Sequence, residues 1–197
     1  PSLDLGEGIG LWTSIRWTLA NRAFRHLALS TAFFLFAFNI IVMALPFWVK
    51  EYLGRDENTV TLLMAPLLGT TMLLFAGVGP LVARFGKYRL FTASILGTAL
   101  CLALFAGVGL TPLGSPLTQM VIIVTLIGVP MTGFSALPFA LLADVIDYDE
   151  RLTGHRREAI FFAVQGTIQK VIIGSAGFTF SVLAYWGPGN NVTVPGL

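Results

Sequence analysis

The chain alternates long apolar runs with short charged segments. Four runs contain no Lys, Arg, Asp or Glu, and a fifth contains only Lys170. A helix that crosses a bilayer needs about 20 mainly apolar residues, and each run is long enough. The expected spans are about 26–49, 58–83, 90–109, 117–143 and 159–186. The pattern therefore predicts an all-α membrane protein with five transmembrane helices.

Glycine and proline mark breaks and bends in these runs. The uncharged stretch 90–143 is too long for one crossing, and GLTPLGSP, residues 109–116, divides it. Other helix-disturbing residues lie inside the spans, namely Pro46, Pro66, Gly69, Pro130, Gly133 and Pro138. Such residues kink helices where protein or a watery cavity satisfies the freed backbone groups. They fit helices that bend around a central path, although both residue types are simply more frequent in transmembrane helices.

The segment before the first span has a different pattern. Between Ile9 and Phe24, large apolar residues recur at helical spacing, namely Leu11, Trp12, Ile15 and Leu19. This predicts a short amphipathic helix on the membrane surface, and an ordinary linker helix fits equally well. Residues 1–25 are therefore expected outside the bilayer core, as an interdomain loop. Residues 187–197 are expected to form a tail beyond the last span.

The cations are distributed unevenly between the two sides of the membrane. Lys50 and Arg55 lie on one side. Nine of the twelve Lys and Arg residues lie on the other, namely Arg16, Arg22, Arg25, Arg84, Lys87, Arg89, Arg151, Arg156 and Arg157. Cytoplasmic loops are enriched in Lys and Arg, so we expect the N-terminus in the cytoplasm and the C-terminus outside.

Composition narrows the functional classes. The chain is 55% hydrophobic and 11% charged, its net charge is only +2, and it has no basic cluster typical of nucleic-acid-binding proteins. The single cysteine, Cys101, excludes an internal disulfide and a cysteine-based metal site. The sequence shows no nucleophile–base set and no metal motif. It therefore predicts neither an enzyme, nor a cofactor, nor a metal site.

One lysine interrupts the last apolar run, AIFFAVQGTIQKVIIGSAGF, residues 159–178. Lys170 lies about 18 Å beyond the expected membrane boundary at Glu158, near the middle of a core about 30 Å thick. A lysine that faces lipid costs about 3 kcal/mol or more, so we expect Lys170 to line a cavity. An ion pair with another helix and snorkelling are the alternatives. Its helix face holds mostly small residues, namely Gly166, Thr167, Ile173 and Gly174.

Three uncharged polar residues lie at a similar depth. Gln165 and Gln169 are about 140° and 100° away from Lys170 around the helix. Asn39 lies near the middle of the first span. Each could reach the same cavity, or could instead hydrogen-bond a neighbouring helix, which is worth about 0.6 kcal/mol.

Charged residues of both signs follow the fourth span in ADVIDYDERLTGHRREAIF, residues 143–161. Asp144 and Asp147 share a helix face. With arginines across a short turn, they predict a salt-bridge latch between helix ends, and a solvated interfacial loop is the alternative. The other charged loop, GPLVARFGKYR, residues 79–89, has Gly86 for a tight turn and three cations.

Together these segments resemble the major facilitator superfamily. GPLVARFGKYR is similar to the loop motif G-x-L-x-D-R-x-G-R-[KR], except that Ala83 replaces the usual acidic residue. LLADVIDYDERLTGHRREAIFFAVQGTIQK, residues 141–170, resembles the glycoside–pentoside–hexuronide:cation symporters, the group of the melibiose permease. Residues 21–54 resemble that group's entry into helix 7. The resemblance implies that the five spans are helices 7–11 of a major facilitator fold. Helices 1–6 and 12 are then expected to be absent from this chain.

The resemblance also implies roles for particular residues. The substrate cavity would be lined by Lys170, Gln165, Asn39, Gly166, Thr167 and Gly174. A cytoplasmic gate would contain Asp144, Asp147, Arg156 and Glu158. The loop motif is represented by Gly79, Arg84, Gly86 and Lys87. Some positions depart from the melibiose permease, because Gly166 replaces a hydroxyl residue, Ser135 a Trp and Pro138 a Gln.

By this resemblance, the chain is expected to be a fragment of a cation-coupled symporter for a sugar or glycoside in a bacterial inner membrane. Transport would proceed by alternating access around a midplane cavity. The partners would be the solute, the lipid bilayer and the N-terminal half, which would bind most of the coupling Na⁺ or H⁺. A lysolipid or amphiphile transporter of the same family, and a non-transporting assembly or sensor protein with this fold, are the alternatives.

Overall fold

The computed structural model describes residues 11–51, 53–56, 58–105, 107–109, 114–154 and 156–186. Within these ranges it contains helices and no strand. The helices are α1 (Leu11–Ala20), α2 (Arg22–Glu51), α3 (Asn58–Phe75), α4 (Val78–Phe85), α5 (Lys87–Phe105), α6 (Pro116–Thr153) and α7 (Glu158–Trp186). Five of them, α2, α3, α5, α6 and α7, are long and apolar enough to cross a membrane. The predicted all-α membrane class is confirmed. Residues 1–10 of the expected surface loop 1–25, and the expected tail 187–197, lie outside the described residues.

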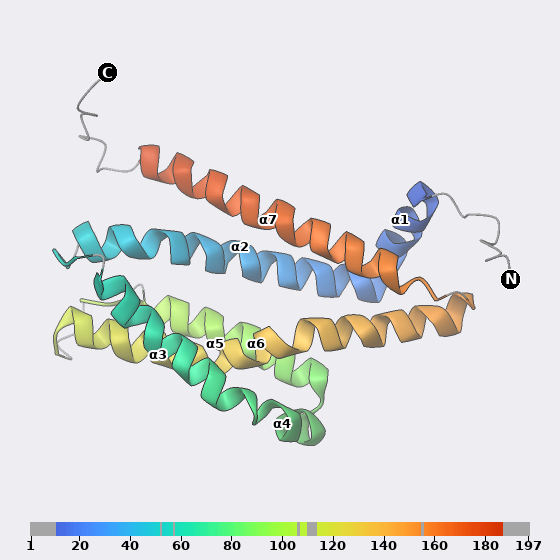
Figure 1. Ribbon diagram of the computed structural model, residues 1–197, viewed down its shortest axis with the longest axis horizontal. Helices are drawn as coiled ribbons and strands as arrows, with labels where there is room; N and C mark the ends of the chain where they lie inside the picture. Colours follow the sequence, from blue (N-terminus) through green and yellow to red (C-terminus); the bar gives the residue numbers. More distant parts are fainter. Residues whose placement is uncertain are drawn as a thin grey trace, which may run out of the picture.

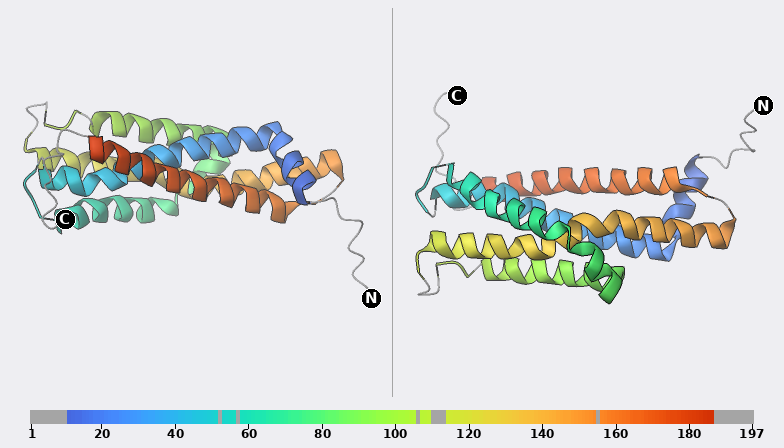
Figure 2. Two further views of the ribbon diagram at one scale, coloured as in Figure 1. Left: turned by 90° about the horizontal axis from the view of Figure 1, so that it is seen from above. Right: turned by 60° about the horizontal axis from the view of Figure 1, so that its bottom comes forward.

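The long helices run along a common direction and form two groups (Figure 1). In one group α2 and α7 lie side by side, and in the other α3 and α5 both pack on α6. The short helix α1 crosses the bundle where α6 ends and α7 begins, as the views in Figure 2 also show. α6 is therefore the central helix of the larger group, and α7 is an outer helix of the smaller one.

Two helix boundaries differ from the pattern of apolar runs. The second run is divided into α3 and α4 at Ala76 and Gly77, because Pro80 has no N–H for the Ala76 carbonyl and Gly77 favours helix poorly. α6 continues past the apolar run to Thr153, through residues expected in a loop. Charged residues mark where a helix leaves the bilayer, but they do not end the helix itself. α6 ends only at Gly154, whose φ is 71° and whose N–H donates to the Glu150 carbonyl.

Short polar side chains set other helix starts. The Ser115 hydroxyl accepts a hydrogen bond from the Thr118 N–H at 3.3 Å, and Pro116 occupies the first position of α6. The Asn21 side-chain oxygen accepts from the Phe24 N–H at 3.2 Å and begins α2. This cap ends the predicted amphipathic segment, so α1 and α2 are separate helices.

Glycines let neighbouring helices approach α6 closely. A Cβ atom on Gly128 would lie 2.9 Å from the Leu67 carbonyl oxygen of α3, and one on Gly133 would overlap the Ser94 hydroxyl of α5. The Thr71 hydroxyl donates to the Gly128 carbonyl at 3.3 Å, which links α3 to α6. Small residues at such contacts are the usual basis of close packing between transmembrane helices.

Aromatic rings fill the centre where α2, α5 and α6 meet. The rings of Phe34 and Phe134 are stacked with centroids 3.6 Å apart, and Phe91 lies 6.1 Å from Phe134. All three side chains are buried. At one end of the bundle, the edge-to-face pair Phe24 and Phe161 joins α2 to α7. Buried aromatic contacts thus connect α2 to α6 and to α7.

Candidate functional site

The middle of α7 presents a face that no described helix covers. Lys170 and Gly174 are exposed there, as is Thr167. The buried residues of this helix are Phe161, Gln165 and Ala176, and they lie on the opposite side, towards α2. We call the surface formed by Gly166, Thr167, Lys170 and Gly174 the lysine face.

The glycines of the lysine face do not bring α7 close to a described helix. A Cβ atom on Gly166 or Gly174 would meet no other atom within 4 Å. The Thr167 hydroxyl donates to the Ala163 carbonyl of its own helix at 2.8 Å, so it makes no bond across to another helix. Among the described residues, no carboxylate pairs with Lys170. The lysine face is therefore small, polar and open.

The two other predicted cavity residues lie elsewhere. Gln165 is 4% exposed and points into the bundle, and its side-chain oxygen has no hydrogen-bond partner within the described part of the chain. The Asn39 amide donates to the Leu35 carbonyl at 2.8 Å, one turn earlier on the same helix. The structure thus places Gln165 away from the lysine face, and Asn39 uses one of its two amide N–H donors within α2.

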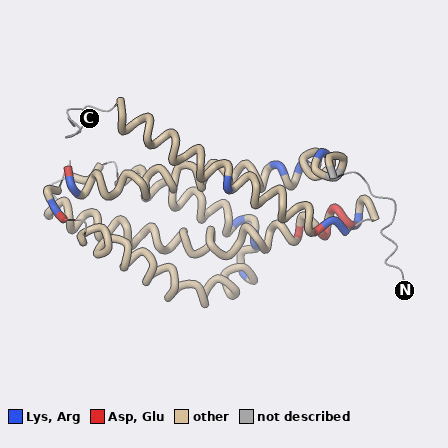
Figure 3. Tube along the Cα trace, turned by 45° about the horizontal axis from the view of Figure 1, so that its top comes forward, with Lys and Arg blue, Asp and Glu red and all other residues tan. Residues whose placement is uncertain are grey.

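Charged residues gather toward the ends of the bundle (Figure 3). We call the end that carries Arg22, Lys87, Asp149 and Arg157 the charged end. The predicted gate residues separate into two groups there. Asp144 pairs with Lys87 at 2.5 Å and so joins α6 to α5, while the exposed Asp147 lines a shallow recess beside it.

Arg156 forms the second group with glutamates. Its guanidinium donates to Glu158 at 3.2 Å and lies 3.8 Å from Glu150, and its side chain is mostly exposed. The hydrogen bond to Glu158, followed by the charge of Glu150, raises the pKa of Arg156 above its ordinary value. Arg156 therefore stays charged at any physiological pH.

The loop motif positions the lysine of the first pair. Gly79 and Arg84 lie in α4, and the Arg84 guanidinium lies 5.3 Å from the Phe85 ring. Gly86 has a φ of 81°, which a residue with a side chain rarely adopts, and it turns the chain from α4 into α5. Lys87 then starts α5 and reaches Asp144, even though this copy of the motif has Ala83 in place of the acidic residue.

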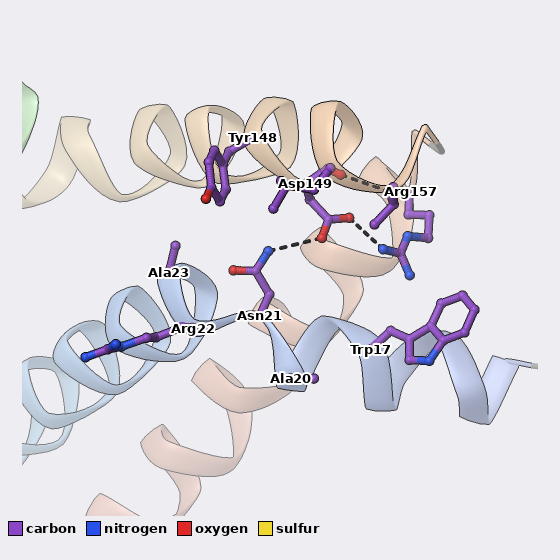
Figure 4. Close-up of a pocket in the computed structure, with 10 residues that line it drawn as sticks. Trp17, Ala20, Asn21, Arg22, Ala23, Tyr148, Asp149 and Arg157 are labelled. Carbon is purple, nitrogen blue, oxygen red and sulfur yellow. Dashed lines mark hydrogen bonds and ion pairs between the residues drawn. The ribbon is translucent and has the colours of Figure 1, made fainter.

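Sequence reasoning missed a buried network at the charged end (Figure 4). The Asp149 and Arg157 side chains are only 7% and 9% exposed and are paired at 2.7 Å. The Asn21 amide donates to the other Asp149 oxygen at 3.1 Å. The Arg157 guanidinium also lies 5.3 Å from the Trp17 ring. This network ties α1, α2, α6 and the start of α7 together. The one available signal was that Asn21 suits a helix cap.

Comparison with known proteins gives the chain its family. The model of the MFS/sugar transport protein family matches residues 5–193. An uncharacterized symporter of Synechocystis sp., sll1374, is 26% identical over 174 residues, which are 87% of this chain and 31% of that protein. The uncharacterized symporter YjmB of Bacillus subtilis is 24% identical over 172 residues, which are 87% of this chain and 36% of that protein.

The chain spans about a third of the length of these curated relatives. No solved structure matches it significantly. The family model nevertheless covers almost all of the chain, and five helices can span a bilayer. The chain is therefore part of an integral membrane protein, and it belongs to the MFS/sugar transport protein family.

Proposed function

We propose that the protein is a cation-coupled symporter for a small sugar or glycoside, and that the lysine face forms one wall of its substrate cavity. The observation that carries this proposal is an ammonium group in the middle of a transmembrane helix, on a face that no described helix covers. A lipid-facing lysine at this depth costs about 3 kcal/mol or more, so a polar or aqueous environment is required.

The chemistry of the lysine face suits a polyhydroxylated solute. An ammonium group offers three donors and no acceptor, which matches the acceptor oxygens of sugar hydroxyls. Gly166 and Gly174 leave space on either side of Lys170, because nothing lies within 4 Å of where their Cβ atoms would be. A ring-shaped solute can therefore lie along α7 in contact with the helix backbone.

Alternating access then assigns roles to the other parts. Na⁺ or H⁺ would be bound mainly by acidic residues of the N-terminal half. The Lys87–Asp144 and Arg156–Glu158 pairs would form and break as the cytoplasmic side closes and opens, since both lie at the charged end. Prolines inside α6, Pro130 and Pro138, supply points at which this central helix can bend.

A counterflow assay on the full-length protein in liposomes tests the proposal. Vesicles preloaded with unlabelled sugar should accumulate labelled sugar, and Lys170→Ala should abolish this exchange. Arg89→Gln, which removes an exposed cation on α5, is the matched control and should keep it. Undiminished exchange in Lys170→Ala would show that the lysine face does not form a wall of the substrate cavity. Absence of exchange for every sugar and glycoside tried, with or without Na⁺ and at several pH values, would favour an amphiphile transporter of the same family or a non-transporting protein.

A further inference from the structure

A second pocket lies at the charged end, far along α7 from Lys170. It is an open pocket of about 700 Å³, lined by residues of α1, the start of α2 and the end of α6 and by Arg157. Figure 4 shows the Arg157 guanidinium between the Asp149 carboxylate and the Trp17 ring. Arg22 and Tyr148 also line it. We call it the arginine pocket.

Arg157 has more hydrogen-bond donors than its neighbours can use. Its Nη2 donates to Asp149, but its Nε and Nη1 atoms are buried and have no partner among the described residues. Those two atoms carry three N–H groups. Buried polar groups in folded proteins are nearly always hydrogen-bonded, and leaving a charged one unpaired is expensive. These N–H groups therefore lack an acceptor within the described part of the chain.

The residues around Arg157 do not supply that acceptor. The Asp149 oxygens accept from Asn21 at 3.1 Å and from Nη2 of Arg157 at 2.7 Å, but from neither Nε nor Nη1. The Trp17 ring contributes only its π-face. Because Arg22 and Arg157 carry two positive charges against the single negative charge of Asp149, the pocket has a net positive charge. An anionic acceptor fits this charge.

The position of the pocket favours a phosphate group. The pocket lies at the end of the bundle where the transmembrane helices leave the bilayer, beside the half-exposed aromatic side chains of Trp17 and Tyr148. Aromatic residues of this kind mark the level of lipid headgroups, and basic pockets between helices there bind anionic headgroups. Arginine is a common phosphate ligand in proteins, because its guanidinium is always charged and is more weakly hydrated than an ammonium group. Trp17 is 46% exposed, so its ring can turn aside and admit a ligand.

We propose that the arginine pocket binds a phosphate ester, with Arg157 donating through Nη1 and Arg22 contributing a second positive charge. The phosphate can come from an anionic phospholipid of the adjacent leaflet or from a soluble phosphate compound. This site is independent of the substrate cavity, so phosphate binding can be tested separately from the proposed transport.

Thermal unfolding of the purified full-length protein in detergent tests this site. A bound ligand raises the Tm of the protein that binds it. Dioleoylphosphatidylglycerol should raise the Tm by several degrees more than dioleoylglycerol, which has the same chains and no phosphate. Sodium phosphate is compared with sodium chloride at equal ionic strength. A rise with the phospholipid alone identifies the lipid as the source, and a rise with phosphate identifies a soluble compound. Equal Tm values in both comparisons would overturn the proposal.

Variants link the effect to the pocket. Asp149→Asn with Arg157→Gln removes both members of the ion pair and so leaves no lone buried charge. It should raise the half-saturating lipid concentration about tenfold or more, because charge-assisted hydrogen bonds to phosphate are lost. Arg22→Gln alters an exposed residue and should weaken the effect less. Arg89→Gln makes the same change of charge outside the pocket and should leave the response intact. An unchanged response in both the double variant and Arg22→Gln would contradict the assignment.

Discussion

α6 and α7 are both long apolar helices interrupted by glycines and charges, yet the two use these residues in opposite ways. The glycines of α6 are in contact, because a Cβ atom at Gly128 would lie 2.9 Å from a carbonyl oxygen of α3. The glycines of the lysine face on α7 have no neighbour within 4 Å. The Asp149 side chain near the end of α6 is buried and paired, whereas Lys170 of α7 is exposed.

The comparison shows that small residues have two different roles in these membrane helices. On α6, small residues bring α3 and α5 close and hold the bundle together. On the lysine face of α7, the glycines do not serve packing within the described part of the chain, since no atom lies within 4 Å of where their Cβ atoms would be. A surface that is small, polar and uncovered at mid-bilayer depth is suited to face a cavity or another part of the protein. The following substitutions test this contrast.

The largest expected difference in stability is between variants of Asp149 and of Lys170. Asp149→Ala leaves Arg157 buried without its partner and should lower the free energy of unfolding by about 3–5 kcal/mol. Lys170→Ala should change it by no more than about 0.5 kcal/mol, as for an exposed site. Unfolding in detergent, followed by circular dichroism, measures both. Equal losses would mean that Lys170 is also held by a buried partner in the whole protein.

The glycines should give the next largest difference. Gly128→Ala places a methyl group against the Leu67 carbonyl and Thr70 and should cost about 1–3 kcal/mol by overpacking. Gly174→Ala meets open space, so its higher helix propensity should make it neutral or stabilising by up to about 1 kcal/mol. The Tm values of the two variants in the same detergent decide this. A comparable fall in both would show that α7 is packed as tightly as α6.

A smaller effect is expected on the buried side of α7. The Gln165 oxygen is buried without a hydrogen-bond partner among the described residues, so Gln165→Met should leave stability unchanged or raise it by about 1 kcal/mol. Thermal unfolding and counterflow should be measured on the same preparation. A clear loss of stability would reveal a partner for Gln165 in the rest of the protein. A loss of exchange without a loss of stability would instead show that Gln165 lines the substrate cavity.

The smallest effect is expected at the Lys87–Asp144 ion pair of the charged end. The Lys87 and Asp144 side chains are 36% and 38% exposed, so water and salt screen their attraction. Lys87→Ala should therefore cost less than about 1 kcal/mol, far below the loss at Asp149. Unfolding at low and high salt checks this, because the small loss should shrink further as salt is added. A loss as large as that of Asp149→Ala would place this pair among the structural contacts.

Much of the fold could be predicted from the sequence, because a lipid environment demands long apolar runs. All five runs became long apolar helices, and the 3.6-residue period predicted that Gly166 and Gly174 share a face with Lys170. The tertiary contacts could not be predicted. The Lys87–Asp144 pair joins residues 57 positions apart, and the burial of Asp149 depends on how α1 crosses the bundle. From sequence, these charges predicted a salt-bridge latch, with a solvated loop as the alternative, but not which residues pair.

The central claim is that the lysine face lines a solute cavity, and thiol labelling at Gly174 tests it most directly. In the full-length protein with Cys101→Ser, Gly174→Cys should react with a membrane-impermeant maleimide, and the solute that exchanges in counterflow should slow the reaction. Leu100→Cys, on the exposed apolar surface of α5, should not react and serves as the control. A Gly174→Cys that stays unlabelled, or that labels at the same rate with saturating solute, would contradict the account.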